Sequence, residues 1–196
     1  MVKKLKLRLI LLGIMVSLTI PTAYAYMYMK SSKLDNQFEI AVANAKVVEV
    51  MDRDKKTSIT IQNTGNIDSY LRLIIYTYWE DSKGNVVGRQ NTTIVNNGNP
   101  VLNFDYDNEQ WIQDGNIFYC KTPVKVGEST PEFFKSGSSI KLQNIEEYVT
   151  SNGVTVKYDY YQVVEIIAEA IQANPTTAVT ESWKVELTGS TITGIK

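Results

Sequence analysis

The sequence predicts an all-β fold, either a sandwich or a barrel, on two observations. Several short segments are rich in β-branched and aromatic residues, and apolar side chains alternate with polar ones in some of them. Glycine beside asparagine marks turns between these segments, at 64–66, 83–85, 97–100, 114–116 and 152–153. Short strands with such spacing are typical of sandwiches and barrels. Because no repeat, linker or low-complexity tract interrupts the pattern, we expect one domain.

The predicted strands, in chain order, cover 37–50, 57–63, 69–79, 116–121, 139–145, 155–172 and 183–192. In the second of these, Ile59 and Ile61 alternate with polar residues. The stretch 163–172, "VVEIIAEAIQ", is ambiguous because it could be helical from Ile166 onward. Its β-branched residues favour a strand.

One short helix or turn is expected before the last strand, in "NPTTAVTESW" at 174–183. Asn174 can cap a helix. Pro175 fits the first helical position, where a missing N–H is not needed.

The first 25 residues have the three parts of a cleaved secretory signal. A positive n-region precedes an apolar stretch at 9–20, and Ala23 and Ala25 are the small residues that a signal peptidase reads. The apolar stretch is short for a membrane span, which needs about 20 residues. An uncleaved N-terminal anchor is the alternative. We expect cleavage after Ala25, a mature chain that begins at Tyr26, and a secreted protein with no permanent membrane anchor.

Composition excludes several function classes. The expected mature chain keeps 16 basic and all 21 acidic residues, for a net charge of −5. This balance argues against a nucleic-acid partner, which would need a basic stripe. The chain has no histidine, so it cannot form a Ser-His-Asp triad or an H-E-x-x-H zinc site. We therefore expect no enzyme, no cofactor and no catalytic residue.

Four local features could have a functional role, and each has a simpler interpretation. Cys120 is the only cysteine, and a buried apolar role is favoured over a reactive thiol or an intermolecular bridge. Glu165 and Glu169 could act as paired carboxylates on a glycosidic bond, but a solvated face is favoured. The acidic loop at 105–109 could hold calcium, but it lacks the EF-hand pattern and is interpreted as a surface loop. The tyrosines Tyr158, Tyr160 and Tyr161 are interpreted as sheet-edge residues or as part of a subunit contact.

Several segments together resemble the TasA/camelysin-like family of biofilm matrix proteins. The signal ends in "AYAY", and "ITIQNTGNIDSYLRL" at 59–73 is similar to the strand–NTG–strand element of that family. The segments "WIQDGNIFYCKTPVKVGEST" at 111–130 and "VEIIAEAIQ" at 164–172 resemble clostridial-type members in order and spacing.

This resemblance implies a jelly-roll-like antiparallel β-sandwich, a signal cut by a dedicated peptidase of the SipW type, and self-assembly into extracellular fibres. Some family members are described as metalloproteases. The absence of histidine argues against that activity here.

The segment at 26–36, between the signal and the first predicted strand, is interpreted as a donor strand. Tyr26, Met27, Tyr28 and Met29 place two large side chains on each face of an extended chain, and a polar tether follows them. Residues 26–36 reach about 35 Å when extended, enough to cross to a neighbouring subunit. A disordered or self-packed N-terminus is the alternative.

The sequence therefore predicts a signal peptide at 1–25, an extended segment at 26–36 and a β-sandwich domain at 37–196. The function expected is that of a secreted subunit of biofilm-matrix filaments, which polymerises head to tail with itself. A secreted, monomeric binding module for carbohydrate or a surface is the second hypothesis.

Overall fold

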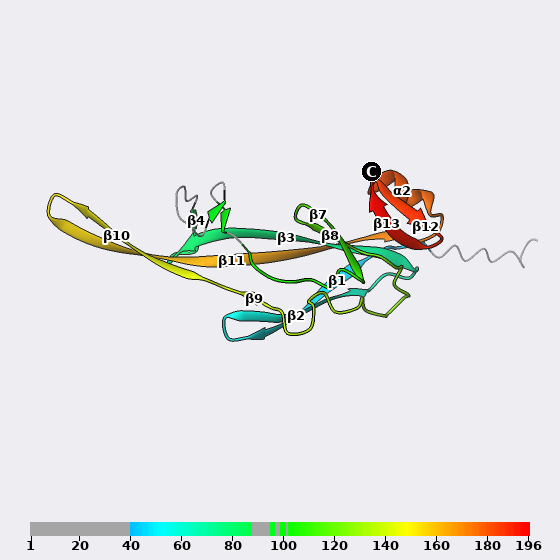
Figure 1. The fold of residues 1–196 in the computed structure, drawn as a ribbon, viewed down its shortest axis with the longest axis horizontal. Helices are drawn as coiled ribbons and strands as arrows, with labels where there is room; N and C mark the ends of the chain where they lie inside the picture. The colour runs from blue at the N-terminus through cyan, green and yellow to red at the C-terminus, as the bar shows by residue number, and fades with distance from the viewer. Residues whose placement is uncertain (1–39, 88–94, 97–98, 101) are drawn as a thin grey trace, which may run out of the picture. The chain divides into compact units, whose positions relative to one another are not determined.

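A computed structural model describes residues 40–87, 95–96, 99–100 and 102–196, and Ala41–Lys196 form one compact unit. Two antiparallel sheets pack face to face in this unit (Figure 1). The smaller sheet has the order β1-β2-β9, and the larger has the order β10-β11-β3-β8-β7, with β4 beside β3. The fold confirms the predicted all-β, jelly-roll-like sandwich with one short helix near the C-terminus.

The strands of the smaller sheet are β1 (Ala45–Asp52), β2 (Lys55–Asn63) and β9 (Ile140–Lys141). Those of the larger sheet are β3 (Ser69–Asp81), β4 (Val86–Val87), β7 (Trp111–Asp114), β8 (Ile117–Cys120), β10 (Asn144–Ser151) and β11 (Val154–Gln172). Two small hairpins join β5 (Val95–Asn96) to β6 (Asn99–Pro100) and β12 (Val185–Thr188) to β13 (Thr191–Ile195). The helix α2 covers Thr177–Ser182.

The main core lies between the two sheets. Strict alternation directs Ile59 and Ile61 of β2 toward Leu71, Leu73 and Ile75 of β3, and all five are buried. An aromatic cluster extends this core, in which Phe118 and Phe133 meet edge to face with ring centroids 4.9 Å apart. Burial of these apolar side chains is the main force that holds the sheets together.

A second, smaller core covers one end of the larger sheet's outer face. Tyr70 of β3 and Tyr119 of β8 pack there against residues of α2, β12 and β13. The Arg72 guanidinium lies 4.6 Å from the ring centroid of Trp183, and its Nε donates to Glu169 Oε2 at 2.7 Å. Burial raises the pKa of the Tyr70 hydroxyl, which donates to Ser190 O at 2.8 Å. These contacts fix the C-terminal hairpin on the sheet.

The ambiguous stretch at 163–172 is a strand, because all of β11 from Tyr160 to Gln172 pairs with β3. The β-branched residues thus agree with the observed state. The turn predicted at Asn152 and Gly153 is also confirmed: both residues have positive φ, 51° and 75°, as a tight two-residue hairpin of the primed type requires.

Some predicted boundaries are wrong. The first strand begins at Ala45 and not at 37, and residues 40–44 approach it without strand structure. The stretch 139–145 divides between β9 and the start of β10. The helix begins at Thr177 after an N-cap at Thr176, so neither Asn174 nor Pro175 has the predicted position. The Thr176 side chain makes no capping hydrogen bond, and packing of Val179 into the second core positions this helix instead.

Candidate functional site

The distinctive surface of the sandwich is an unpaired edge of β11. Up to Tyr161 this edge is paired with β10, and the junction lies at Gln162. Gln162 N donates to Gln143 O at 2.8 Å, and Gln143 N donates to Gln162 Oε1 at 3.0 Å. Because N–H and C=O groups alternate in direction along a strand, Val164, Ile166, Ala168 and Ala170 direct theirs to the same edge as Gln162. Among the described residues, no strand pairs with this edge over 163–172.

The outer edge of β1 also has no strand partner among the described residues. Thr64 N donates to Asn44 O at 3.0 Å, so Asn44 faces β2 and the next residue, Ala45, faces away from it. The Ala45 N–H donates to the side-chain Oδ1 of Asn44 at 2.9 Å. Within the described part of the chain, β1 has β2 as its only strand partner, which leaves its outer edge open.

These two edges border one side of the sandwich, which we call the open seam. It is defined by Ala45 and Val47 of β1 and by Ile166, Ala168 and Ala170 of β11. All five pack against the main core but stay partly exposed, although they lie on the core-facing sides of their strands. Three of the five are alanines, whose small side chains cover little of the core on this side of the sandwich. The seam thus offers a strand's hydrogen-bonding groups beside partly exposed apolar residues.

The opposite edge of the smaller sheet is closed. Residues 127–133 run along β2, where Asn63 N donates to Glu128 O at 2.9 Å and Thr130 N donates to Ile61 O at 2.9 Å. Side chains complete this closure, since Ile61 N donates to Thr130 Oγ1 and Ile59 N donates to Glu132 Oε1. The segment "GESTPEF" at 127–133 therefore covers this edge, which is one of the ways in which sheets avoid unwanted pairing.

The NTG motif at 63–65 fixes the point where the chain enters β1. Asn63 is fully buried, and its Nδ2 donates to the carbonyls of Ile67 and Val124, both at 2.9 Å. Asn66 N donates to Val42 O at 3.0 Å, and Val42 N donates back to Asn66 Oδ1 at 2.7 Å. A Cβ on Gly65 would lie 2.2 Å from Val42 O, so only glycine permits this close approach. The motif thus holds residues 42–44 at the end of β2.

The other sequence candidates form no group that could hold a metal ion in the described residues. Glu165 and Glu169 share the outer face of β11, as expected, and Glu169 is paired with Arg72. No group of three or more described His, Cys, Asp or Glu side chains lies where it could hold a metal ion, so the described loop at 105–109 offers no such group.

Cys120 is buried and donates to Thr122 O at 3.4 Å, and burial raises its pKa to about 11. A thiol in this state is a poor nucleophile.

A shallow hollow is present on another surface. It is lined by Phe104, Asp105 and residues 135–139, and Asp105 N donates there to Ser138 Oγ at 2.7 Å. Its charged side chains, Asp105 and Lys135, are solvent-exposed. The hollow has the polar lining of an open surface loop.

The predicted cleavage residues Ala23 and Ala25 and the predicted donor residues from Tyr26 to Met29 lie outside the described residues. In the ranges that are described, no helix is long and apolar enough to cross a membrane.

Sequence reasoning missed the seam alanines, because small apolar residues in "AEAIQ" carry no strand signal of their own. Their alternation with Glu169 and Ile171 was the available clue.

Comparisons with protein-family models, with curated proteins and with solved structures found no match to this chain.

Proposed function

We propose that the protein is a secreted structural subunit that assembles by donor-strand exchange into extracellular filaments of a biofilm matrix. In this mechanism the segment that begins at Tyr26 leaves its own domain and binds in the open seam of the next subunit. Each subunit gives one strand and receives one, so the contact is head to tail and builds an open polymer. The resemblance of the sequence to TasA/camelysin-like proteins supports the same role.

The observation that carries the proposal is the open seam itself. Its β11 edge, 163–172, is about 33 Å long, so the four donor residues 26–29, which span about 13 Å as a strand, can lie along it with their tether leading away. A donated strand would satisfy the edge N–H and C=O groups by β-augmentation. Large side chains of the donor would pack against the partly exposed Ala168 and Ala170. Size and chemistry of the donor therefore match those of the seam.

Processing is the first requirement of this mechanism. Because the donor must be released from the apolar stretch at 9–20, the secreted protein should begin at Tyr26 after cleavage by a signal peptidase of the SipW type. N-terminal sequencing of secreted protein tests this. Secreted chains that still begin with Met1 would contradict it.

Removal of the donor tests the exchange itself. Deletion of 26–33 should give a folded, soluble subunit that does not polymerise, because these residues precede the compact unit Ala41–Lys196. The pair Met27→Asp and Met29→Asp should act in the same way, since two carboxylates would enter an apolar seam. The matched control places the same charges in the tether, as Ser31→Asp and Ser32→Asp, and should still polymerise. Negative-stain microscopy and sedimentation distinguish these outcomes, and normal filaments from the deletion variant would refute the mechanism.

Blocking the seam gives the complementary test. Ala168→Leu should fill part of the seam, so this variant can donate a strand but accepts one poorly. The deletion variant can accept a strand but has none to donate. Neither should polymerise alone, and a mixture should form a 1:1 complex of limited size by sedimentation velocity. Failure of the mixture to associate, with both variants folded by circular dichroism, would place the acceptor elsewhere.

The alternative is a secreted monomeric binding module for carbohydrate or a surface, for which the hollow beside Phe104 is the available site. Mature protein that stays monomeric at rising concentration would favour this alternative over the filament subunit.

A further inference from the structure

The end of the larger sheet carries a two-stranded ribbon that extends past every other strand described. β3 pairs with β11 only from Tyr160 onward, so among the described residues, 154–159 have β10 as their only strand partner. We call residues 146–159 the arm, and its tip is the turn at Asn152 and Gly153. Figure 1 shows this hairpin reaching beyond β3 and β4. Isolated two-stranded ribbons are marginally stable in water, so contact with a partner would stabilise an arm of this length.

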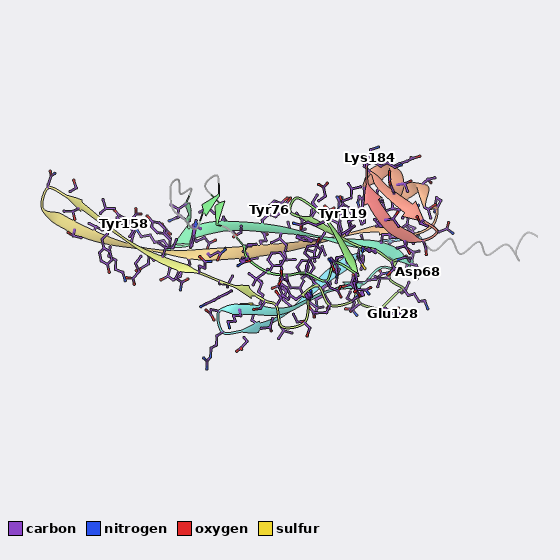
Figure 2. The ribbon with its side chains drawn as sticks, in the orientation of Figure 1. Asp68, Tyr76, Tyr119, Glu128, Tyr158 and Lys184 are labelled. Atoms are coloured by element: carbon purple, nitrogen blue, oxygen red, sulfur yellow. The ribbon has the colours of Figure 1, made fainter. Side chains whose placement is uncertain are left out.

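One face of the arm is apolar and continues the core-facing side of the sheet. Residues 154, 156 and 158 have the same parity as Val164 and Ile166, which face the main core, and the β10–β11 register has no shift. The smaller sheet does not cover this part, so the exposed fractions are 62% for Val154, 44% for Val156 and 43% for Tyr158. Val149 of β10, the cross-strand partner of Val156, is 45% exposed. Figure 2 shows Tyr158 on the arm, away from the dense packing between the sheets.

The opposite face of the arm is polar and makes its own contacts. Lys157 Nζ lies 2.7 Å from Glu146 Oε1 and 3.0 Å from Asp159 Oδ1. Hydrogen bonds from Lys157 and Tyr148 lower the pKa of Glu146. The hydroxyls of Thr150 and Thr155 lie 2.9 Å apart across the strands. The arm is thus amphipathic, with a self-satisfied polar face and an apolar face exposed to solvent.

We propose that the apolar face of the arm packs against the same face of the arm of a second copy. A two-fold axis near the Val149–Val156 pair would set the two ribbons antiparallel, about 10 Å apart as in stacked sheets. The small residues at one tip, Ser151 and Val154, then lie opposite Tyr158 of the other arm, so small and large side chains alternate across the contact.

Charge agrees with this arrangement. Glu147 is the only charged residue of the apolar face in the arm, and it lies two positions from the central Val149. The two copies of Glu147 would therefore be about 13 Å apart along the arms, which exceeds the screening length of about 8 Å at physiological ionic strength. Face-to-face packing brings no like charges together at its centre.

The size of the contact sets its role. Six residue pairs over two strands give a footprint of roughly 190 Å² on each arm, well below the roughly 800 Å² that each partner contributes to a stable complex. Arm pairing is therefore weak between free subunits and becomes effective where many arms are arrayed. Resting on the proposed function, we assign arm pairing to lateral contacts between filaments.

Two adjacent cross-strand pairs provide a matched test. Val149→Lys with Val156→Glu places an ion pair on the apolar face, and Thr150→Lys with Thr155→Glu places the same ion pair on the polar face. Both keep the cross-strand attraction of the hairpin, so they differ only in the face that is changed. Tyr158→Thr is a milder third variant that keeps a residue suited to strands.

The first measurement uses the variant that lacks 26–33, because it separates arm pairing from polymerisation. Sedimentation velocity from about 10 μM to about 1 mM should show weak, concentration-dependent dimers with the wild-type arm. The apolar-face change should weaken this association at least about tenfold, Tyr158→Thr should weaken it less, and the polar-face change should leave it within about twofold. Microscopy of the full mature chain should show bundled filaments, which separate into single filaments with the apolar-face change.

The outcomes distinguish this proposal from the filament hypothesis. If the variant that lacks 26–33 forms dimers that depend on the apolar face, but the full mature chain forms no filaments, arm pairing is supported and the filament hypothesis is refuted. If the full mature chain forms filaments, but the apolar-face change alters neither their bundling nor the weak dimers of the deletion variant, arm pairing is overturned. Monomers at every concentration with a wild-type arm would also overturn it, and would assign the apolar face to another segment of the chain or to a different partner.

Discussion

At the residue scale, Gly65 shows how the absence of a side chain can determine where residues 42–44 lie before β1. The space for its Cβ is occupied by backbone, the carbonyl of Val42 and the amide of Asn44. Backbone cannot rotate away as the end of a flexible side chain can. Glycine at this position therefore lets residues 42–44 lie against the end of β2 and positions the start of β1.

Gly65→Ala should destabilise the domain by about 2 kcal/mol or more, because the clash can be relieved only by moving residues 42–44. The control is Gly194→Ala, whose Cβ would come within 3.0 Å of the movable carboxylate of Glu186. That change should cost less than about 1 kcal/mol. Urea unfolding followed by tryptophan fluorescence measures both, and equal effects of the two substitutions would contradict the role of Gly65.

The buried thiol of Cys120 has a pKa of about 11 in the folded chain, against an ordinary value of 9.0. Because the folded pKa is raised, the unfolded chain loses this proton first as pH rises. The thiol therefore lowers the free energy of unfolding between about pH 9 and pH 11, by about 2–3 kcal/mol at the upper end. Below pH 9 this effect is absent.

Stability curves of the wild type and of Cys120→Ala should thus converge as pH rises from 9 to 11, since the variant has no thiol to ionise. At pH 8 iodoacetamide should label Cys120 in urea and leave it unlabelled in the folded protein. Rapid labelling of the folded protein would show that the thiol is accessible.

Cys120→Ser should still assemble, because a single thiol cannot form an internal disulfide.

At the element scale, β11 unites two environments in one strand. Its C-terminal part lies between the core and the second core, and its N-terminal part belongs to the exposed arm. The arm is held by one strand partner and by the turn at Asn152 and Gly153. Local stability should therefore fall along β11 toward the tip.

Gly153→Val tests this dependence, because a β-branched residue at φ 75° is strained. We expect the arm to lose about 1–2 kcal/mol of local stability while the melting temperature of the domain changes little. Hydrogen exchange should then be faster in 146–159 and unchanged in β3. An equal increase throughout β3 would mean that the arm and the sandwich unfold as one unit.

The elements best predicted from the sequence are those in which one face is buried. The alternation of Ile59 and Ile61, and of Leu71, Leu73 and Ile75, records the main core directly. β10 was not recognised as a separate strand, because "NIEEYVTS" has no face that its own domain buries. The open seam was hidden for a related reason: it depends on which strand lies beside β11, and pairing partners far apart in the chain leave no local pattern.

At the scale of the whole molecule, some strand edges of the sandwich are covered and others are not. Residues 127–133 cover the outer edge of β2, and the outer edges of β1 and of β11 over 163–172 have no strand partner among the described residues. An uncovered edge beside partly buried apolar residues invites pairing with another chain. The strand edges are thus open on one side of the sandwich, and the edge of β2 is covered on the other.

Assembly should therefore add stability to each subunit. In the proposed donor-strand exchange the partner's strand binds the folded domain and not the unfolded chain, so polymerised protein should melt at a higher temperature than the variant that lacks 26–33. Adding a synthetic peptide of residues 26–36 to that variant should raise its melting temperature in proportion to the logarithm of peptide concentration, once the seam is nearly saturated. A peptide with Asp at positions 27 and 29 is the control. Equal effects of both peptides would argue against specific binding in the seam.

The single continuous strand β11 also has a mechanical consequence. Thirteen consecutive residues, from Tyr160 to Gln172, pair with β3 in one unbroken antiparallel register. A pull along β11 that is resisted by β3 loads these hydrogen bonds in shear, so they must fail together. A pull across the strands would instead open them one pair at a time, at lower force. Tension that enters β11 at the tip of the arm and leaves through the Ser69 end of β3 thus meets the stronger of the two geometries.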